Sequence, residues 1–389
     1  MNDNDRNSWS EDEERTGPLD GIRVVEYGRF VTAPFASRLL GDLGADVVKV
    51  ETGDGDPFRA FGDSKQISAQ FLALNRSKKS VSIDPRTDEG RDDMRMLLEW
   101  ADVFIVNSRP GSMERLGFGY ADVSKTNPGI VYCSITGSGT VGAIARRPAY
   151  DMVGQALSGL ASQFIDDANP RVTGPNLSDS LAGMTAAYGI LGALVERERS
   201  GQGQAIEIDM ISSSLAFIGA EAQIYFETGV SPGPGTRPSF SSSFAIRCSD
   251  GKLLGIHLSS LAKFWEGLAR ALDRPDLLVD ERFQTRGGRI ANYEALRAEL
   301  AATMSVRDRT WWLDRFQAED VPCAPIHRIE DVFDDPELAD LQLSHEIGDG
   351  SEKFRTLAVP VRYGRTPVST GFRPPRVGEH TDEVLKPMR

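Results

Sequence analysis

The sequence predicts an α/β protein whose first part folds into a doubly wound sheet of parallel strands. β-rich runs alternate with amphipathic helical segments over roughly the first 140 residues, which is the pattern of such a sheet. The length of 389 residues exceeds that of a typical single hydrophobic core and indicates two domains. The composition, with 40% hydrophobic and 26% charged residues, is ordinary for a globular protein.

The first β-α-β unit lies near the N-terminus. Residues 21–28 form a short β-rich run between glycines, and residues 45–51 form a second run. Between them, residues 33–44 start beside Pro34, end at Gly44 and carry apolar residues at helical spacing. A strand, a helix and a strand in this order imply parallel pairing with a crossover helix.

The same alternation continues and then gives way to helices. The sequence predicts strands over 79–85, 102–107 and 129–137, with a helix over 88–101. Beyond Tyr150, the predicted elements are a helix over 150–162, a helix over 179–201, and a strand followed by a helix over 203–229.

The second half of the chain begins after a loop. Residues 230–244 are dense in glycine, proline and serine, which is typical of a domain boundary. An Asp250-Gly251 turn predicts a β-hairpin over 244–258, and amphipathic helices follow it. The last segment, 373–388, is rich in proline and then helical.

Composition excludes several classes of partner. A net charge of −13 argues against a nucleic-acid binder, and no apolar run is long enough to span a membrane. The three cysteines show neither CxxC nor zinc-like spacing, which predicts no metal site and fits a reducing compartment. Residues 1–16 are polar and acidic, so we expect a disordered tail rather than a signal peptide. These features favour a cytoplasmic enzyme.

The motifs of several common enzyme classes are incomplete. The first turn has a single glycine, Gly28, where a dinucleotide fingerprint needs three. A Gly-x-Gly-x-x-Gly match at 137–142 precedes a segment that Pro148 breaks, so we expect no nicotinamide or flavin site. The four histidines all lie in the second half, and neither a serine-hydrolase elbow nor an HExxH zinc motif is present.

Basic residues gather near the ends of several predicted strands. Ligands of open α/β sheets bind beyond the carboxyl ends of the strands, so this cluster predicts a polyphosphate or nucleotide site. A solvated basic surface is the simpler alternative. The residues are Arg76, Lys78, Lys79, Arg86, Arg109 and Arg115.

Asp151 stands where a loop becomes a helix, after Arg146, Arg147 and Pro148. An aspartate at this place can simply stabilise the helix end. The same surroundings suit a nucleophile, because the positive helix end and the arginines keep the carboxylate ionised, and only the anion attacks a carbonyl. These residues alone leave both interpretations open.

Six segments, in order, resemble the class III CoA-transferases, the group of carnitine and formyl-CoA transferases. They are residues 18–51, 74–84, 101–120, 127–139, 148–159 and 378–385. The resemblance implies a Rossmann-like large domain built from both chain ends, an inserted smaller α+β domain and an interlocked homodimer. The implied division is a tail at 1–16, a large domain of 17–225 and 327–389, and an insert of 226–326.

The resemblance also implies the residues of the site. Asp151 matches the nucleophile, and coenzyme A is a co-substrate that needs no metal, nicotinamide or flavin. Arg109 and Arg115 match contacts to the nucleotide, and Gly137 lies in a loop along the pantetheine path. The full implied set of CoA contacts is Val31, Thr32, Ile83, Asp84, Pro85, Arg86, Asn107, Ser108, Arg109, Arg115 and Gly137.

Three departures from the formyl-CoA transferases point to a different acid. Val31 and Thr32 stand where those enzymes carry glutamine and alanine, and Thr52 replaces an arginine that some members use on the nucleotide. Residues 231–239 replace a tetraglycine flap. We therefore expect a more apolar acyl pocket, and neither formyl nor oxalyl substrates.

The expected activity is transfer of CoA from an acyl-CoA donor to a small carboxylic acid, through an aspartyl anhydride and an aspartyl-CoA thioester. One alternative is an α-methylacyl-CoA racemase, a class that also resembles the chain. Racemases pair the aspartate with a histidine, and a histidine typically precedes it where this chain has Tyr150. The other alternative is a catalytically silent CoA-binding protein in which Asp151 only caps a helix.

Overall fold

The computed structural model describes residues 16–61, 67–259, 261–348, 350, 353–369 and 371–389. The contacts divide the chain into two units. Unit 1 extends to Ala161 and also contains Gly174–Gly219 and Gln342–Arg389, whereas unit 2 contains Ser162–Thr173 and Ala220–Leu341. The predicted acidic tail lies outside the described residues, apart from Thr16.

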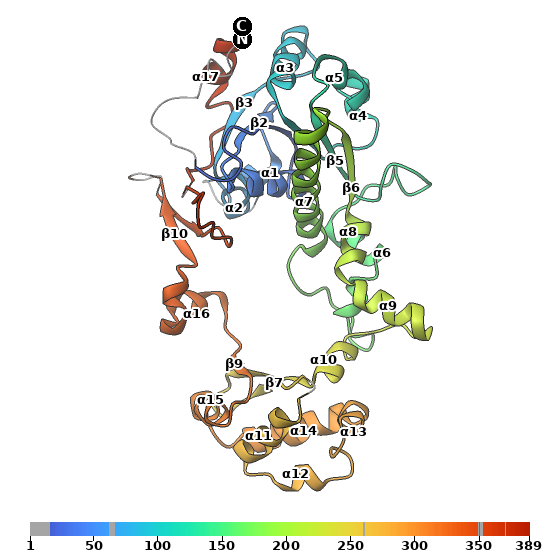
Figure 1. Ribbon diagram of the computed structural model, residues 1–389, viewed down its shortest axis with the longest axis vertical. Coiled ribbons are helices and arrows are strands. Elements are labelled where there is room, and N and C mark those ends of the chain that lie inside the picture. Colours follow the sequence, from blue (N-terminus) through green and yellow to red (C-terminus); the bar gives the residue numbers. More distant parts are fainter. Residues whose placement is uncertain (1–15, 62–66, 260, 349, 351–352, 370) are drawn as a thin grey trace. The chain divides into compact units, whose positions relative to one another are not determined.

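Unit 1 is built on a six-stranded sheet in the order β3-β2-β1-β4-β5-β6 (Figure 1). All neighbouring strands pair in parallel, which confirms the predicted parallel α/β sheet. The chain order reverses between β1 and β4, and ligands of open α/β sheets bind at such a switch point. The strands are β1 Arg23–Tyr27, β2 Asp46–Glu51, β3 Lys78–Ser82, β4 Val103–Val106, β5 Val131–Thr136 and β6 Ala205–Asp209.

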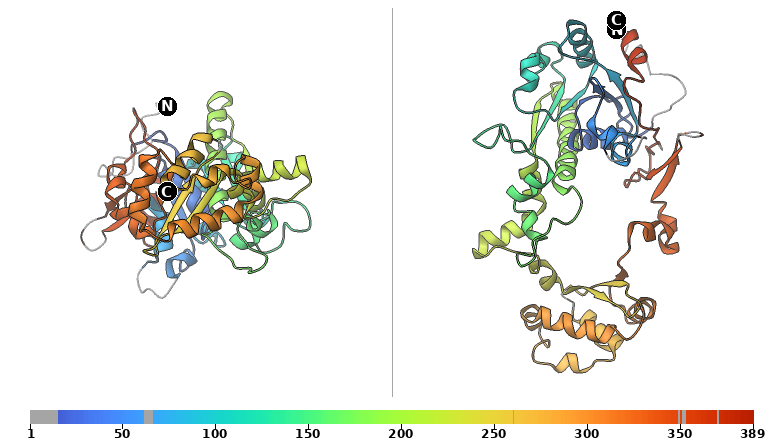
Figure 2. Two further views of the ribbon diagram at one scale, coloured as in Figure 1. Left: turned by 90° about the horizontal axis from the view of Figure 1, so that it is seen from below. Right: turned by 180° about the vertical axis from the view of Figure 1, so that it is seen from behind.

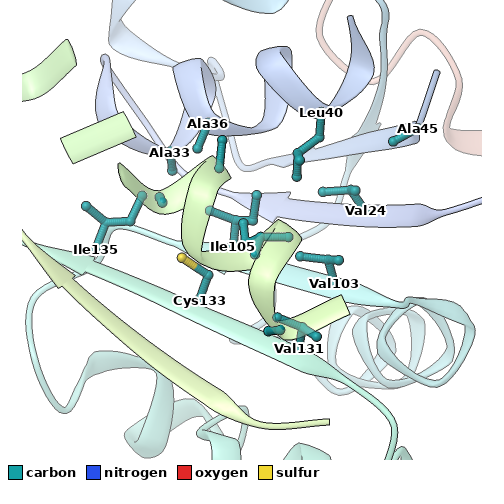
Figure 3. Close-up of a cluster of buried hydrophobic side chains, with 14 of the residues drawn as sticks. Val24, Ala33, Ala36, Leu40, Ala45, Val103, Ile105, Val131, Cys133 and Ile135 are labelled. Carbon is teal, nitrogen blue, oxygen red and sulfur yellow. The ribbon is translucent and has the colours of Figure 1, made fainter. Parts of the chain in front are cut away.

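Helices cover both faces of this sheet (Figures 1 and 2). On one face, α1 (Thr32–Gly41) and the long α7 (Leu177–Ser200) pack on the central strands. Figure 3 shows part of this core, in which Val24, Ile105 and Cys133 of the strands lie beneath Ala36 and Leu40 of α1. Small residues on the helices allow them to lie close to the β-branched residues of the strands.

The C-terminal end of the chain returns to the opposite face. Val384 of α17 (Thr381–Leu385) is buried in a second core with α3 (Asp88–Trp100) and strands β1 to β5. The His380 N–H donates to the Ser80 carbonyl of β3 at 2.9 Å, and Lys79 pairs with Glu383 at 2.6 Å. Residues from both ends of the chain therefore complete one core.

Local sequence signals explain where several helices begin and end. Thr87 caps α3 by accepting a bond from the Gly90 N–H at 3.0 Å, and Asp209 caps α8 by accepting from the Ser212 N–H at 2.7 Å. Gly201 ends α7 in the left-handed conformation, with φ of 71°. The other α-helices of unit 1 are α2 Ala69–Asn75, α4 Ser112–Leu116, α5 Tyr120–Thr126, α6 Asp151–Leu157 and α8 Met210–Phe217.

The remaining strands form two antiparallel sheets. In unit 2, β7 (Ser243–Arg247) and β8 (Leu253–His257) form the predicted hairpin, and β9 (Cys323–Pro325) adds to β8. In unit 1, β10 (Ser344–Ile347) pairs with β11 (Phe354–Leu357). The remaining α-helices are α9 Gly219–Thr228, α10 Thr236–Ser241, α11 Ala262–Leu272, α12 Asp276–Val279, α13 Arg286–Ala291, α14 Tyr293–Met304, α15 Arg309–Ala318 and α16 Ile329–Asp334.

Candidate active site

A pocket of about 490 Å³ opens at the switch point of the six-stranded sheet. Its walls come from the segments that follow β1, β4 and β5, because the carboxyl ends of parallel strands meet at one edge. The lining includes residues 27–32, 107–110, 136–138 and 147–150, with Asp179 from the first turn of α7.

The turn after β1 forms one wall and has a constrained backbone. Gly28 leaves no room for a side chain, because an added Cβ would lie 2.5 Å from the Cβ of Ala33. Phe30 has a φ of 63°, a conformation that is uncommon for a bulky residue. Its ring stacks edge-on with those of Phe58 and Tyr150, at 5.4 and 6.0 Å between centroids. These aromatic contacts hold the turn against the loop that precedes Asp151.

Asn107, the residue after β4, fixes the same turn by hydrogen bonds. Its side-chain oxygen accepts from the Arg29 N–H at 3.0 Å, and its amide nitrogen donates to the Arg29 carbonyl at 2.7 Å and to the Thr32 hydroxyl at 3.0 Å. The Phe30 N–H donates to Asp56 at 3.2 Å. The pocket wall is therefore pre-formed by side chains from two other segments.

A buried network of charges supports this wall from below. The Lys49 ammonium donates to Glu26 at 2.7 Å, to the Gly28 carbonyl at 3.0 Å and to Asp56 at 3.1 Å, and Lys78 donates to Glu26 at 2.9 Å. Burial opposes the charge of Glu26, but the two ammonium groups more than offset it and hold the pKa of this carboxyl well below its usual range. Lys49 thus ties strand β1 to the turn that lines the pocket.

Three members of the predicted basic cluster are buried, namely Arg76, Lys78 and Lys79, the last in its pair with Glu383. Lys78 belongs to this buried network, and Arg76 is buried in a two-bond ion pair with Asp42, at 2.8 Å for both bonds. The prediction of an anion site was wrong for Arg76 and Lys78. The carboxylates that neutralise them come from other elements, so the run of basic residues gave no sign of its partners.

Asp151 is the first residue of α6, beside the pocket. One carboxylate oxygen accepts a bond from the Gln155 amide at 2.6 Å, and the other accepts from the backbone N–H of Asp179 at 3.2 Å. Tyr150 occupies the N-cap position, and its side chain makes no capping bond. The Asp151 carboxylate lies at the positive end of α6, but its two bonds run to a side chain and to another helix rather than to the α6 backbone.

Asp179 places a second carboxyl group next to Asp151. It lines the pocket from the first turn of α7. Burial, and then the charge of Asp151, raise the pKa of Asp179 to about 7. The site therefore places a carboxyl group with a raised pKa, that of Asp179, next to Asp151. Two neighbouring carboxyl groups can divide the roles of nucleophile and acid.

The structure brings together six of the eleven predicted CoA contacts. Those that line the pocket are Val31, Thr32, Asn107, Ser108, Arg109 and Gly137. The others lie outside its lining. Arg115 donates to Ser112 on α4, Ile83 is buried, and Asp84 and Arg86 pair with each other at 2.7 Å beside Pro85. A role for these five on a distant part of the ligand stays a prediction.

Several pocket residues gave no recognised signal in the sequence. Arg29 and Glu51 line the pocket from inside the matched segment 18–51, but neither was picked out as a contact. Asp56 and Asp179 line it from outside all six matched segments. Arg29 directly follows Gly28 and was the easiest to find, because residues after a strand of an α/β sheet are ligand candidates. Asp179 could be recognised as a site residue only from the structure, because the packing of α7 against α6 is what brings it to Asp151.

The described ranges contain no group of three or more histidine, cysteine, aspartate or glutamate side chains arranged to hold a metal ion. A search of the same residues finds no helix with the length and apolar character to cross a membrane.

Comparison with known proteins gives one consistent result. A sequence profile of CoA-transferase family III matches residues 19–381. The chain is 34% identical over 385 residues to a succinyl-CoA:mesaconate CoA-transferase of Haloarcula marismortui, which covers 95% of this chain and 96% of the relative. It is 32% identical to a succinyl-CoA:glutarate CoA-transferase of Mus musculus, with 95% and 86% covered. A crystal structure of a CAIB/BAIF family protein from Brucella suis matches with a TM-score of 0.86 at 31% identity, with 96% and 100% covered.

Proposed function

This chain belongs to CoA-transferase family III, and we propose that it transfers CoA from an acyl-CoA donor to a carboxylic acid through covalent intermediates on Asp151. The observation that carries this proposal is the placement of Asp151. Its carboxylate is oriented by Gln155 and by the Asp179 amide next to a pre-formed pocket, and it does not serve as a cap for its own helix.

The reaction divides into exchanges at the Asp151 carboxyl carbon. The carboxylate attacks the donor thioester, which gives a mixed anhydride and CoA thiolate. The thiolate attacks the aspartyl carbonyl, so the donor acid leaves as a carboxylate and an aspartyl-CoA thioester remains. The acceptor carboxylate attacks this thioester, and the released thiolate then takes the new acyl group and frees Asp151. Each step conserves an activated acyl bond, so the chemistry needs no ATP.

We propose a dicarboxylic acid as the acceptor. The relatives named above act on mesaconate and glutarate. Besides Arg109, which we expect on CoA, Arg29 and Arg147 line the pocket and can pair with a second carboxylate. The test is to mix succinyl-CoA or acetyl-CoA with a panel of free acids and to identify the CoA esters by mass spectrometry. Mesaconate and glutarate should yield new esters, whereas formate and oxalate should not. If no acid accepts CoA from any donor, the proposed transfer is wrong.

The racemase alternative finds less support. No histidine belongs to the described lining of the pocket, and Tyr150 occupies the position before the aspartate. Incubation with a 2-methylacyl-CoA in deuterated water decides between the two. Deuterium at the α-carbon would favour the racemase.

Arg109→Ala should weaken CoA binding. Arg109 lines the pocket, and loss of a charge-assisted bond to phosphate costs about 1.5–3 kcal/mol, or roughly 10- to 150-fold in Kd. Arg115→Ala should act in the same direction if the nucleotide extends along α4. Calorimetric titration with CoA measures both, with Arg95→Ala on the exposed side of α3 as the matched control. If both variants bind CoA as tightly as wild type, the two arginines do not contact CoA and belong to a solvated basic surface.

We further propose an interlocked dimer, with the large domain of 17–225 and 327–389 threaded by a second copy. An exposed apolar stripe on α7 favours contact with a second chain. Its residues Met184, Tyr188 and Val195 are all more than half exposed in the single chain. Threaded chains cannot separate without opening. A dimer should therefore persist at nanomolar concentration in light scattering, and tagged and untagged dimers should not exchange subunits in native buffer. Hybrid dimers that form rapidly on mixing would contradict the threaded arrangement.

A further inference from the structure

The proposed chemistry uses one carboxyl group, and the pocket contains a second one beside it. The backbone N–H of Asp179 donates to Asp151 at 3.2 Å, so the two residues are in direct contact. Within the described part of the chain, no hydrogen bond reaches the carboxyl group of Asp179 itself. The Asp179 side chain is partly buried in the pocket wall, where its carboxyl group can meet a bound ligand.

Asp151 of α6 is the charged group that raises the pKa of Asp179. The other charged groups that line the same pocket are Arg29, Glu51, Asp56, Arg109 and Arg147. The elements packed against the start of α7 contribute neutral groups, which are Thr32 and Phe35 from α1, Met210 and Ser214 from α8, and the end of β5. The acids of β6 are engaged elsewhere, since Asp209 caps α8 and Glu207 accepts from Thr140.

We infer that Asp179 is a catalytic acid that gives its proton to the sulfur of CoA when the thioester breaks, and takes it back when the sulfur attacks again. The inference rests on the proposed function. It deepens that function by assigning the proton that accompanies CoA out of and into the covalent intermediate.

Atoms and charges balance in this step. At the start Asp151 is a carboxylate and Asp179 is a carboxylic acid. Asp151 forms a bond to the acyl carbon, the carbon–sulfur bond breaks with its electron pair going to sulfur, and the Asp179 proton moves to that sulfur. The pocket then holds the neutral anhydride, a CoA thiol and the Asp179 carboxylate. On the return, the thiol loses its proton to Asp179 as sulfur attacks the Asp151 carbonyl, and the donor acid leaves as an anion.

The two carboxyl groups are coupled in the sense that this step requires. The charge of Asp151 is one of the two causes that raise the pKa of Asp179. Acylation removes that charge, so Asp179 becomes a stronger acid as the thiolate develops. The pair of Asp151 and Asp179 therefore carries one negative charge both before and after the acylation of Asp151. A pKa near neutrality also lets one group donate and accept in turn.

The test compares the pH dependence of kcat/KM in wild type and Asp179→Asn. Wild type should lose activity above pH of about 7, as Asp179 loses its proton. Asp179→Asn should be slower by roughly 10²- to 10⁴-fold, the usual range for general acid–base catalysis, and should lack this alkaline limb because the amide does not titrate. Asp179→Glu retains an acid, so it should keep the limb and recover part of the rate.

Controls separate this role from a structural one. The asparagine keeps the backbone N–H to Asp151, and circular dichroism and CoA titration should match wild type. Asp122→Asn, on the exposed side of α5, should leave the profile unchanged. If the Asp179→Asn enzyme still loses activity above pH of about 7, the inference is overturned, whatever the absolute rate of the variant. Failure of hydroxylamine to trap acylated Asp151 in wild type would instead defeat the proposed function, so the two failures are distinguishable.

Discussion

Replacing Asp151 with asparagine should abolish CoA transfer and leave the fold intact. The amide has nearly the same shape as the carboxylate but is a poor nucleophile. Turnover should fall by roughly four to six orders of magnitude, as in other covalent enzymes that lose the nucleophile or the group that activates it. Gln155 can rotate its own amide to keep a bond to the substituted side chain, so the unfolding temperature should change little. Steady-state transfer assays and thermal unfolding measure the two effects.

Trapping identifies the residue that becomes acylated. Wild-type protein incubated with donor and hydroxylamine should carry the modification at Asp151, and peptide mass spectrometry locates it. If another carboxylate is modified instead, the assignment of Asp151 as the nucleophile is wrong. An Asp151→Asn variant with unchanged acyl-CoA chemistry would favour the silent CoA-binding protein, in which this aspartate serves only the helix end.

Glu26→Ala should produce the largest loss of stability. Glu26 is fully buried and accepts bonds from Lys49, Lys78 and the Ser37 hydroxyl. Removing it leaves two buried ammonium groups without their shared counter-charge, and breaking a buried ion pair costs about 3–5 kcal/mol. Chemical unfolding should show this loss, and amide exchange in β1 and β2 should accelerate. Glu266→Ala, on the exposed side of α11, is the control.

The same site predicts a dependence of stability on pH. Because the pKa of Glu26 is lowered to about 2 in the folded protein, its contribution is fully present above the ordinary glutamate pKa of 4.5 and is lost progressively as the pH falls from there to about 2. The difference in unfolding free energy between wild type and Glu26→Gln should therefore shrink as the pH is lowered from 4.5 to about 2. A difference that stays constant would show that Glu26 gains nothing from its charge.

The sheet was predictable because its signals are local. Strand, helix and strand alternate with clear periodicity from Arg23 to Thr136, and glycines and prolines mark the turns. The resemblance to the family, not the strand pattern, pointed to Asn107 and Gly137, and both line the pocket just after β4 and β5. The strand order, and hence the switch point between β1 and β4, needed the structure.

The rest of the site depends on contacts between distant residues. The basic run around Lys78 reads as a surface, because charge in a sequence says nothing about burial, and Glu26 lies on another strand. Asp179 reads as an ordinary acid in the first turn of a helix. Its altered acidity arises from burial and from Asp151, which is 28 positions earlier in the chain.

Because α17 packs in the core of unit 1, the two units can complete their folding in a fixed order during translation. A ribosome makes the chain from its N-terminus, and domains generally fold as units. Unit 2 has all its residues once Leu341 has been made, whereas the core of unit 1 lacks Val384 and Leu385 until the ribosome has passed them. The apolar strands of unit 1 thus wait partly uncovered while unit 2 is translated. Removal of α17 should therefore impair completion of this core and leave unit 2 unaffected.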